Sequence, residues 1–226
     1  MMDTTQILEK TKRAYDSPAW WYDVRGFFIL KLSYQSGLFR QIRFFGNNMG
    51  PRHLEVAIGT GSLFALLLLY RVLHRLPASK TSGFDLAPKM LEGARARVGK
   101  KTELFLGDVC HLNLPDHSFD SINVANAFHC FPDPATALQE LYRILKPSGT
   151  LAMNVLLQPS GNRLRDRIAR RINAWGIRKG ILYKPYELET IFALIDHSSF
   201  RTSKITQKGN SLEFLLDSQK REPNQE

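Results

Sequence analysis

The feature that most constrains the fold is an apolar strand that runs directly into a glycine turn and then into a helix. Residues 53–58 predict a short buried strand, Gly59-Thr60-Gly61 a tight turn, and residues 62–75 a helix. Glycine accepts positive φ and lets a ligand approach the backbone closely. Because open α/β sheets bind ligands beyond the carboxyl ends of their strands, this turn is the first candidate for a binding site.

The same alternation of strand and helix continues along the chain. Further strands are expected at residues 81–85, 103–106, 121–125 and 150–157, and helices at 88–98, 134–145 and 185–194. Two last strands, 200–206 and 211–216, flank the short turn Lys208-Gly209-Asn210 and must therefore be antiparallel neighbours. The pattern predicts an α/β, Rossmann-like, doubly wound sheet of seven strands, mostly parallel, with an antiparallel C-terminal hairpin.

The distribution of aromatic residues divides the chain into three parts. Ten of the 24 aromatic residues fall between Tyr15 and Phe45, which predicts an N-terminal helical cap over residues 1–48. The ligand-binding domain is expected over residues 49–217. Residues 218–226 are polar and read as a flexible tail.

Composition and charge exclude several classes of protein. The first residues are polar and the longest apolar run, residues 63–70, is too short to span a bilayer, which predicts a soluble, cytoplasmic protein. Cys110 and Cys130 show no metal-ligand spacing, so no metal site is expected. The formal net charge of +10 fits either contact with an anionic partner or a merely solvated basic surface.

Three carboxylates accompany the successive strands near the glycine turn. Glu55 lies in the first strand, Asp85 ends the second, and Asp108 follows the third. An acidic residue at the position of Asp85 takes ribose hydroxyls in nucleoside-binding α/β folds. A short carboxylate at Asp108 can accept a hydrogen bond from an adenine amino group. Together with the glycine turn, the carboxylates predict a nucleoside pocket, although each alone could be a helix cap or a turn former.

These motifs, with residues 119–122 (Phe-Asp-Ser-Ile) and 145–149 (Leu-Lys-Pro-Ser-Gly), resemble the class I S-adenosylmethionine-dependent methyltransferases. The nearest resemblance is to the branch that contains the ubiquinone and menaquinone C-methyltransferases, and it covers about residues 52–156. It implies S-adenosylmethionine as cofactor, S-adenosylhomocysteine as product and a small-molecule acceptor.

The resemblance also assigns residues to the cofactor. Glu55 would engage the methionine amino end, Gly59 and Gly61 would pass beneath the cofactor, and Asp85 would hold the ribose. Asp108 with Val109 would bind adenine, and Asn126 and Ala127 would border the methionine moiety. The complete implied cofactor set is Glu55, Ala57, Gly59, Thr60, Gly61, Asp85, Leu86, Met90, Asp108, Val109, Asn126 and Ala127. Ala57 stands where the family usually has its first glycine, which narrows the turn.

Other functions on the same fold fit the sequence less well. A nicotinamide-dependent oxidoreductase needs a small third residue in its glycine motif, and Phe64 occupies that place. RNA is a less favoured substrate, because residues 126–129 (Asn-Ala-Phe-His) lack the Asn/Asp-Pro-Pro-aromatic clamp of base methyltransferases. Cys130 does not follow a proline, as the nucleophile of pyrimidine methylases does. A cofactor-binding protein without transfer activity stays as a further alternative.

Methyl transfer from a sulfonium is an in-line displacement that depends mainly on alignment, so a dedicated base is optional. His129 is the candidate base if the acceptor is a hydroxyl, although a histidine between apolar neighbours is as often a packed structural residue. Trp21, Tyr22 and Phe128 are the candidate walls of the acceptor pocket, and large residues at helical spacing also commonly pack in a core. The preferred acceptor is a small apolar or aromatic metabolite, such as a quinone-like compound or lipid precursor.

Residues 162–180 contain seven lysines and arginines, with Leu164, Ile168, Ile172 and Trp175 at helical spacing among them. This pattern predicts a basic amphipathic helix. Such a helix can contact an anionic membrane peripherally or guide an acidic or lipidic acceptor. Alternatively, it packs by its apolar stripe and leaves a solvated basic face, which is the slightly favoured interpretation. The sequence leaves open the oligomeric state and the atom that is methylated.

Overall fold

The computed structural model describes residues 19–218, with the side chains of all but residues 19–22 and 25. Its centre is one sheet of seven strands in the order β3-β2-β1-β4-β5-β7-β6. The strands are β1 (Arg52–Val56), β2 (Lys80–Asp85), β3 (Thr102–Leu106), β4 (Phe119–Val124), β5 (Leu145–Leu156), β6 (Arg201–Lys208) and β7 (Ser211–Asp217). The first five strands pair in parallel, and β7 is antiparallel to both β5 and β6. The predicted sheet and its reversed C-terminal hairpin are therefore confirmed.

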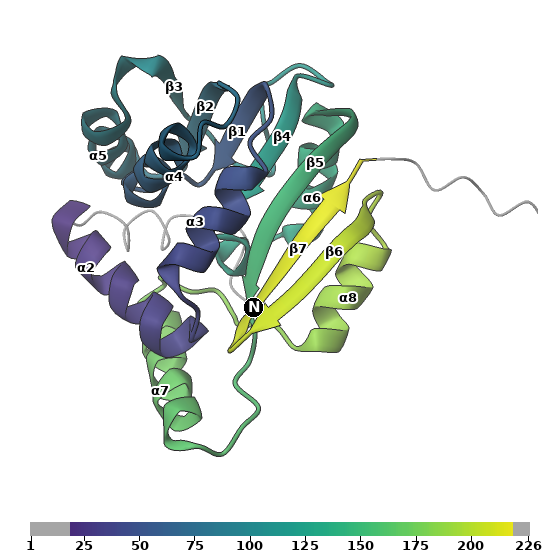
Figure 1. Ribbon diagram of the computed structural model, residues 1–226. Coiled ribbons are helices and arrows are strands. Elements are labelled where there is room, and N and C mark those ends of the chain that lie inside the picture. The colour runs from purple at the N-terminus through teal and green to yellow at the C-terminus, as the bar shows by residue number, and fades with distance from the viewer. Residues whose placement is uncertain (1–18, 219–226) are drawn as a thin grey trace, which may run out of the picture.

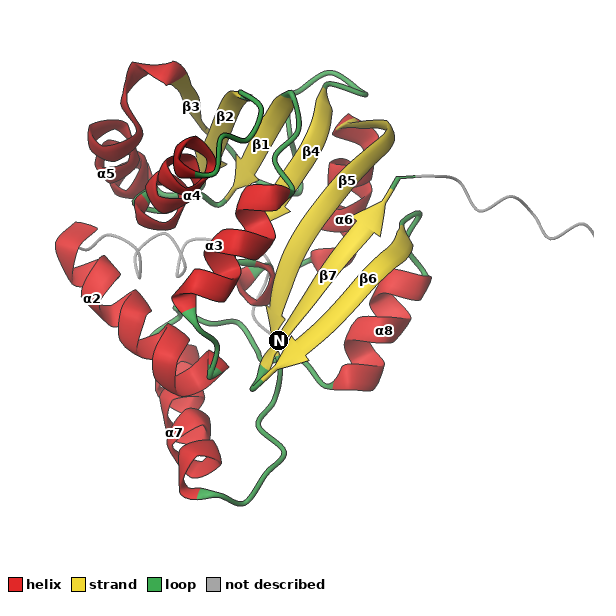
Figure 2. Cartoon of the chain, viewed as in Figure 1, coloured by secondary structure: helices red, strands yellow, loops and turns green. Residues whose placement is uncertain are grey.

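Helices cover both faces of this sheet (Figure 2). One face carries α3 (Leu38–Asn47), α4 (Ser62–Leu73) and α5 (Pro88–Val98), with the short helix η2 (Gly99–Lys101) after α5. The other face carries α6 (Pro134–Ile144) and α8 (Leu188–Asp196). Three further helical segments lie at the carboxyl end of the parallel strands, namely α2 (Ala19–Ile29), its π-helical continuation η1 (Leu30–Tyr34) and α7 (Leu164–Arg178) (Figure 1).

The sheet separates two apolar cores. Alternate residues of a strand point to opposite faces. Leu54 and Val56 accordingly join the core that includes Leu138 and Leu141 of α6. On the opposite face, Phe45 of α3 is fully buried in a second core with residues of α4 and α5. Helix α3 is thus an integral layer of the fold, whereas the sequence analysis grouped it with the N-terminal cap.

The fifth strand begins earlier than its pattern suggested. The sequence analysis extended the preceding helix to Leu145 and started the strand at residue 150, but β5 starts at Leu145, which pairs with Phe119. Proline has no amide hydrogen and clashes with the preceding helical turn. Pro147 therefore stops helix α6, and Leu145 is buried as the first residue of the strand.

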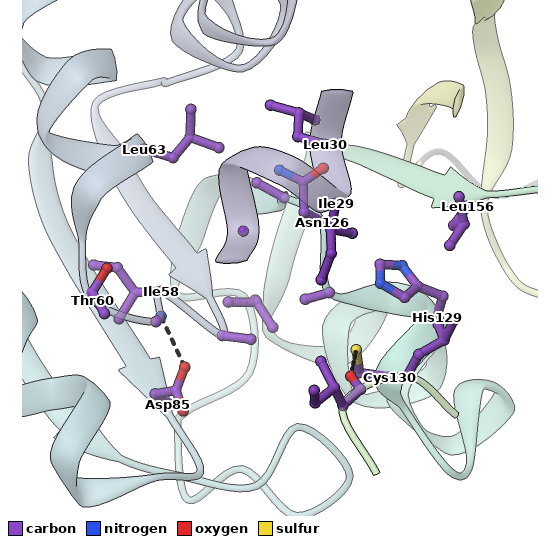
Figure 3. A pocket seen from close by; sticks show the side chains of 18 of the residues that line it. Ile29, Leu30, Ile58, Thr60, Leu63, Asp85, Asn126, His129, Cys130 and Leu156 are labelled. Atoms are coloured by element: carbon purple, nitrogen blue, oxygen red, sulfur yellow. Dashed lines mark hydrogen bonds between the residues drawn. The ribbon is translucent and has the colours of Figure 1, made fainter. Parts of the chain in front are cut away.

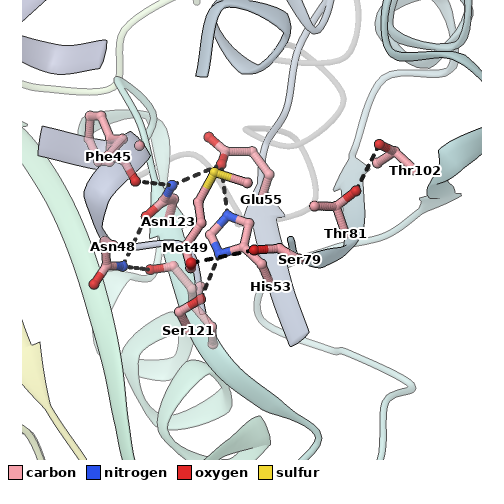
Figure 4. Close-up of polar contacts among 12 residues, drawn as sticks. Phe45, Asn48, Met49, His53, Glu55, Ser79, Thr81, Thr102, Ser121 and Asn123 are labelled. Carbon is pink, nitrogen blue, oxygen red and sulfur yellow. Dashed lines mark hydrogen bonds and ion pairs between the residues drawn. The ribbon is translucent and has the colours of Figure 1, made fainter. Parts of the chain in front are cut away.

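The face opposite Leu54 and Val56 contains a buried polar network on β1 and β4 (Figure 4). Glu55 Oε2 lies 3.3 Å from His53 Nε2 and accepts a hydrogen bond from Asn123 Nδ2 at 3.2 Å. His53 Nδ1 lies 2.8 Å from Ser121 Oγ. Burial raises the pKa of Glu55 to about 8 and lowers that of His53 to about 3. Near pH 7 the two side chains therefore form a neutral hydrogen bond and not an ion pair.

In the part of the chain that the structure describes, no helix has both the length and the apolar character needed to cross a bilayer. No three histidine, cysteine, aspartate or glutamate side chains gather there as a metal site. Cys110 and Cys130 are not joined by a disulfide.

The raised pKa of Glu55 predicts how stability depends on pH. The ordinary pKa of 4.5 becomes about 8 in the folded state, so the folded chain binds the extra proton between these values. The free energy of unfolding must then fall as pH rises. The lowered pKa of His53 acts with the opposite sign, but only below its ordinary value of 6.5. Between pH 6.5 and 8 we expect the free energy of unfolding of wild type, measured by urea denaturation, to fall by about 1.5 kcal/mol relative to that of Glu55→Gln. The histidines His53 and His129 contribute equally to both proteins and cancel in this difference.

Asp120→Asn is the matched control for this experiment. Its side-chain contact with Lys146 lowers the pKa of Asp120 further below its ordinary value of 3.8, so this carboxylate does not titrate near neutral pH. The control should keep the wild-type slope whatever its effect on absolute stability. An equal slope in wild type and Glu55→Gln would contradict the assignment.

Candidate active site

A cavity of about 390 Å³ lies beyond the carboxyl ends of the parallel strands. Residues at or just after the ends of β1, β2, β3, β4 and β5 line its floor, and residues of α2, η1 and α7 form its outer wall. Its size is in the range of small-molecule sites. Figure 3 shows Asp85 and Thr60 on one side of it, with His129 and Leu156 on the other.

The backbone turn after β1 is tied to the end of β2. Gly59 N donates to Asp85 Oδ2 at 2.8 Å, and Ala87 N donates to Asp85 Oδ1 at 2.9 Å. Burial raises the pKa of Asp85 above its ordinary value, while these amide hydrogens act in the opposite direction. Gly59 has a φ of 59°, the left-handed region that glycine accepts without steric cost. The turn and the carboxylate therefore form one unit facing the cavity.

Ala57 adopts a conformation that suits glycine better. Its φ is 51°, and left-handed backbone costs an L-residue about 1 kcal/mol. Its side chain is half-buried and the residue lines the cavity. The alanine noted in the sequence is thus accommodated in a strained turn without closing the cavity.

The cavity brings together most of the residues that the resemblance assigned to the cofactor. They are Ala57, Gly59, Thr60, Asp85, Leu86, Asp108, Val109, Asn126 and Ala127. Asn126 is held in place by a reciprocal pair of 3.0 Å hydrogen bonds with Gln41 of α3. Its backbone amide also donates to Asn154 Oδ1 of β5. Asp108 Oδ1 accepts from Cys110 N at 3.0 Å, which orients this carboxylate as well.

Three of the assigned residues do not line the cavity. Glu55 points away from it into the buried network of β1 and β4. At Gly61 a Cβ would approach Ala94 Cα to 3.0 Å, so this glycine allows α4 and α5 to pack closely. Met90 is 1% exposed and belongs to the core. In the structure these three residues therefore do not line the cavity in which the other assigned residues gather.

The sequence analysis missed Asp23, which holds α2 over the glycine turn. Asp23 Oδ1 accepts from Thr60 Oγ1 at 2.5 Å and from Ser62 Oγ at 2.9 Å. Asp23 Oδ2 pairs with Arg97 Nη2 of α5 at 2.5 Å. Asp23 also lines the cavity. The sequence analysis considered only the aromatic residues of this segment, and no local sequence pattern distinguishes Asp23.

The side of the cavity away from Asp85 is mainly apolar. Its apolar residues include Ile29, Leu30, Leu156, Ile172, Ile181 and Leu182. Tyr34, His129 and Asn173 add polar groups to the same side. Among the side chains that the structure describes, no lysine or arginine lines any part of the cavity.

His129, the candidate base, is buried and lines the cavity. The hydroxyl of Tyr34 lies 2.9 Å from its Nδ1 and 3.0 Å from its Nε2, and the rings meet edge to face. Burial lowers the pKa of His129 to about 3, well below the neutral range expected of an efficient base. The imidazole is therefore neutral and serves as a hydrogen-bonding group.

The aromatic residues found beside the cavity differ from those that the sequence analysis predicted. Phe128 is fully buried and packs against Phe131 and Tyr186, outside the cavity. This corrects its assignment to the substrate pocket. Trp21 and Tyr22 fall within α2, but their side chains lie outside those described. Tyr34, which the sequence analysis counted only among the cap aromatics, is the aromatic residue beside His129.

The central part of the chain is similar to known methyltransferases. Residues 54–153 match the family described as the methyltransferase domain. A demethylmenaquinone methyltransferase from Thermotoga maritima is 37% identical over 115 residues, 51% of this chain and 48% of that protein. One from Thermus thermophilus is 39% identical over 105 residues, 45% of this chain and 46% of that protein. The chain spans about half the length of the curated relatives it matches.

Solved structures share the complete fold at low identity. A SAM-dependent methyltransferase from Aquifex aeolicus superposes with a TM-score of 0.61 and 19% identity, covering 96% of this chain and 99% of that one. At such identity the likeness establishes the fold alone.

The contacts of Asp23 predict that its carboxylate keeps α2 closed over the turn. Replacing Asp23 by Ala removes charge-assisted hydrogen bonds to α4, α5 and the turn between β1 and α4. We expect amide hydrogen exchange in residues 19–29 to rise by at least about tenfold. Exchange measured by mass spectrometry tests this, with Glu92→Ala, an exposed acid on α5, as the control. Unchanged exchange in α2 would show that other contacts hold the helix.

Proposed function

We propose that this chain, whose residues 54–153 match the methyltransferase domain family, uses S-adenosylmethionine to methylate a small, neutral, largely apolar acceptor. The observation that carries the proposal is the composition of the cavity. One side has the glycine turn with Asp85 and Asp108, and the other side has apolar walls with a few polar groups. A single cavity of this kind can hold the cofactor and the acceptor together.

The residues on the first side fit the cofactor. Asp85 and Asp108 end neighbouring strands, and each carboxylate is oriented by backbone amides. Their remaining lone pairs suit a ribose diol and an adenine amino group. Phe84, Leu86 and Val109 supply apolar surface for the base. When bound, S-adenosylmethionine supplies the sulfonium methyl group.

The second side supports a neutral acceptor with one polar end. Among the described side chains no lysine or arginine lines the cavity, so a negatively charged acceptor would find no cationic partner there. Tyr34, His129 and Asn173 lie among aliphatic side chains, an arrangement that suits a hydroxyl or carbonyl on an apolar body. The names of the demethylmenaquinone methyltransferases to which the chain is similar support a quinone-like compound. A lipid precursor of the same polarity is compatible with the walls.

The contribution of this chain to the reaction is alignment in a site shielded from water. In-line displacement requires the acceptor atom, the methyl carbon and the sulfur to be collinear, and fixed walls supply most of the rate. We assign the neutral His129–Tyr34 pair to hold the acceptor oxygen. The hydroxyl of Tyr34 lies within hydrogen-bond distance of both ring nitrogens, so it can donate to whichever of them carries no hydrogen.

RNA is a weaker candidate for the acceptor. Phe128 is packed in the core and cannot stack on a base. A cofactor-binding protein without transfer activity would bind S-adenosylmethionine at the same residues but would methylate no acceptor. These alternatives separate in two measurements, cofactor binding and turnover.

Asp85→Ala tests the cofactor side. We expect wild type to bind S-adenosylmethionine and S-adenosylhomocysteine with micromolar-range affinity in calorimetry, and Asp85→Ala to lose at least about 100-fold. Asp116→Ala, an exposed acid that does not line the cavity, is the control and should bind normally. Absence of binding by folded wild type would remove the basis for methyl transfer and favour a scaffold role.

The acceptor side is tested by Tyr34→Phe and His129→Ala. With a short-chain prenylated naphthoquinol as acceptor, we expect kcat to fall by about tenfold to 100-fold while cofactor affinity stays within about twofold. Wild-type activity should show no ionisation at the ordinary histidine pKa of 6.5, because that of His129 is about 3.

Cys130→Ala, which alters a neighbouring cavity residue, is the control for these variants. A parallel loss of cofactor binding would assign Tyr34 and His129 a structural role. If wild type binds the cofactor but methylates no member of a panel of quinols, phenols and lipid precursors, the binding protein without transfer becomes the better explanation.

A further inference from the structure

Helix α7 attaches to the fold by a small and polar face. Its buried residues are Asp166, Ala169, Asn173 and Gly176. Asn173 accepts a hydrogen bond from Ser33 of η1, and Asp166 accepts one from Gln35 at 3.3 Å. These residues recur at three- and four-residue spacing and hence share one side of the helix.

The large apolar residues of α7 face solvent instead. Leu164 is 71% exposed, and Ile168 and Trp175 are each 37% exposed. The favoured sequence interpretation, that these residues pack the helix against the core, therefore fails for Leu164 and holds only in part for Ile168 and Trp175. Only Ile172 of the predicted stripe reaches the cavity wall.

Basic residues border this exposed apolar stripe. With 100° per residue, Leu164, Ile168 and Trp175 fall within one narrow sector, and Arg171 and Arg178 lie directly beside it. Both arginines are exposed. The outer face of α7 is thus an apolar strip next to a row of guanidinium groups.

A second exposed apolar stripe lies on α2 and η1. Val24, Phe27, Phe28 and Leu32 are each between 38% and 56% exposed, and their spacing places them along one side of the helical segment. Figure 1 shows α2 and α7 at the same end of the molecule, beyond the strand ends. Phe27 of this stripe also lines the cavity, as do Ile29 of α2 and Ile172 of α7. The exposed apolar stripes therefore lie on the helices that enclose the acceptor side.

We propose that the outer face of α7, with the apolar stripe of α2 beside it, docks on a bilayer that contains anionic phospholipid. Trp175, Leu164 and Ile168 would enter the boundary between headgroups and acyl chains, where tryptophan is favoured. Arg171 and Arg178 would pair with lipid phosphates. An RNA backbone matches the arginines but offers no hydrocarbon for the exposed leucine and isoleucine, so the lipid surface fits the whole face better.

Docking in this orientation brings the acceptor side of the cavity next to the bilayer. Given the proposed methyl transfer, α7 would then stand between the membrane that holds an apolar acceptor and the cavity that contains Tyr34 and His129. Lipid binding itself does not rest on that proposal, because it needs neither cofactor nor turnover.

Co-sedimentation with vesicles tests the docking. We expect wild type to bind vesicles of phosphatidylcholine mixed with phosphatidylserine, and to bind pure phosphatidylcholine much less. Arg171→Gln with Arg178→Gln should weaken binding to the anionic vesicles by about 30-fold. Leu164→Ser with Trp175→Ser should weaken it by about tenfold and leave the charge unchanged.

Lys100→Gln with Lys101→Gln is the matched control, because it removes the same charge from exposed residues of η2. It should change vesicle binding by no more than about twofold. Equal losses in both charge variants would mean that net charge alone governs binding, and would overturn the proposed face. Equal binding to both kinds of vesicle, or binding to single-stranded RNA without binding to anionic vesicles, would also overturn it.

Calorimetry with S-adenosylmethionine completes the test. The α7 variants alter exposed side chains, so their cofactor affinity should match that of wild type. This measurement separates membrane docking from methyl transfer. Vesicle binding can fail while cofactor binding persists, and cofactor binding can fail while vesicle binding persists.

Discussion

The hydrogen bond from Gly59 N to Asp85 is the interaction on which the site depends. It joins the turn after β1 to the end of β2, its parallel neighbour, and it fills one lone pair of a buried carboxylate. A buried carboxylate without such partners would be protonated and would lose its value as an acceptor. The amides of Gly59 and Ala87 oppose that shift. The left-handed backbone of Ala57 and Gly59 is needed to aim the first of these amides, which is why strain is tolerated there.

Helices α2 and α7, which form the outer wall of the cavity, are attached to the fold in a different way from the turn after β1. Helices α2 and α7 are held at polar points, namely Asp23 on the turn and Asn173 on Ser33. Ile29 at the end of α2 also packs against a small apolar cluster of Tyr34, Leu156 and Leu182. Several of their large apolar side chains are exposed, among them Phe27, Phe28 and Leu164. A layer attached in this way can open locally without exposing the two cores of the sheet, because neither core includes its side chains. The substrate-facing wall is therefore the part of the fold best suited to move.

Local patterns explain which features could be predicted. The alternation of strands and helices follows from periodicity and the hairpin from Gly209-Asn210, and the positions of Asp85 and Asp108 follow from the ends of their strands. The alternation of a strand also places Glu55 opposite Leu54 and Val56, so its absence from the cavity could have been inferred. The contacts of Asp23, Tyr34 and Asn173 join residues far apart in the chain and leave no local signal. Amphipathic spacing identifies the apolar side of α7, but it cannot tell whether that side faces the core or solvent.

The distribution of charge decides between the interpretations of the basic composition. Asp23, Asp85 and Asp108 line the cavity without a lysine or arginine among the described lining side chains, so the interior favours a cofactor that carries a sulfonium and an ammonium. The positive charge of residues 163–179 lies on the exposed side of α7. If the basic side of α7 guided an acidic acceptor, that acceptor would have to move from arginine side chains on the surface to a cavity lined by aspartates. The proposed neutral acceptor and the proposed anionic bilayer outside the cavity are compatible with both of these charge distributions.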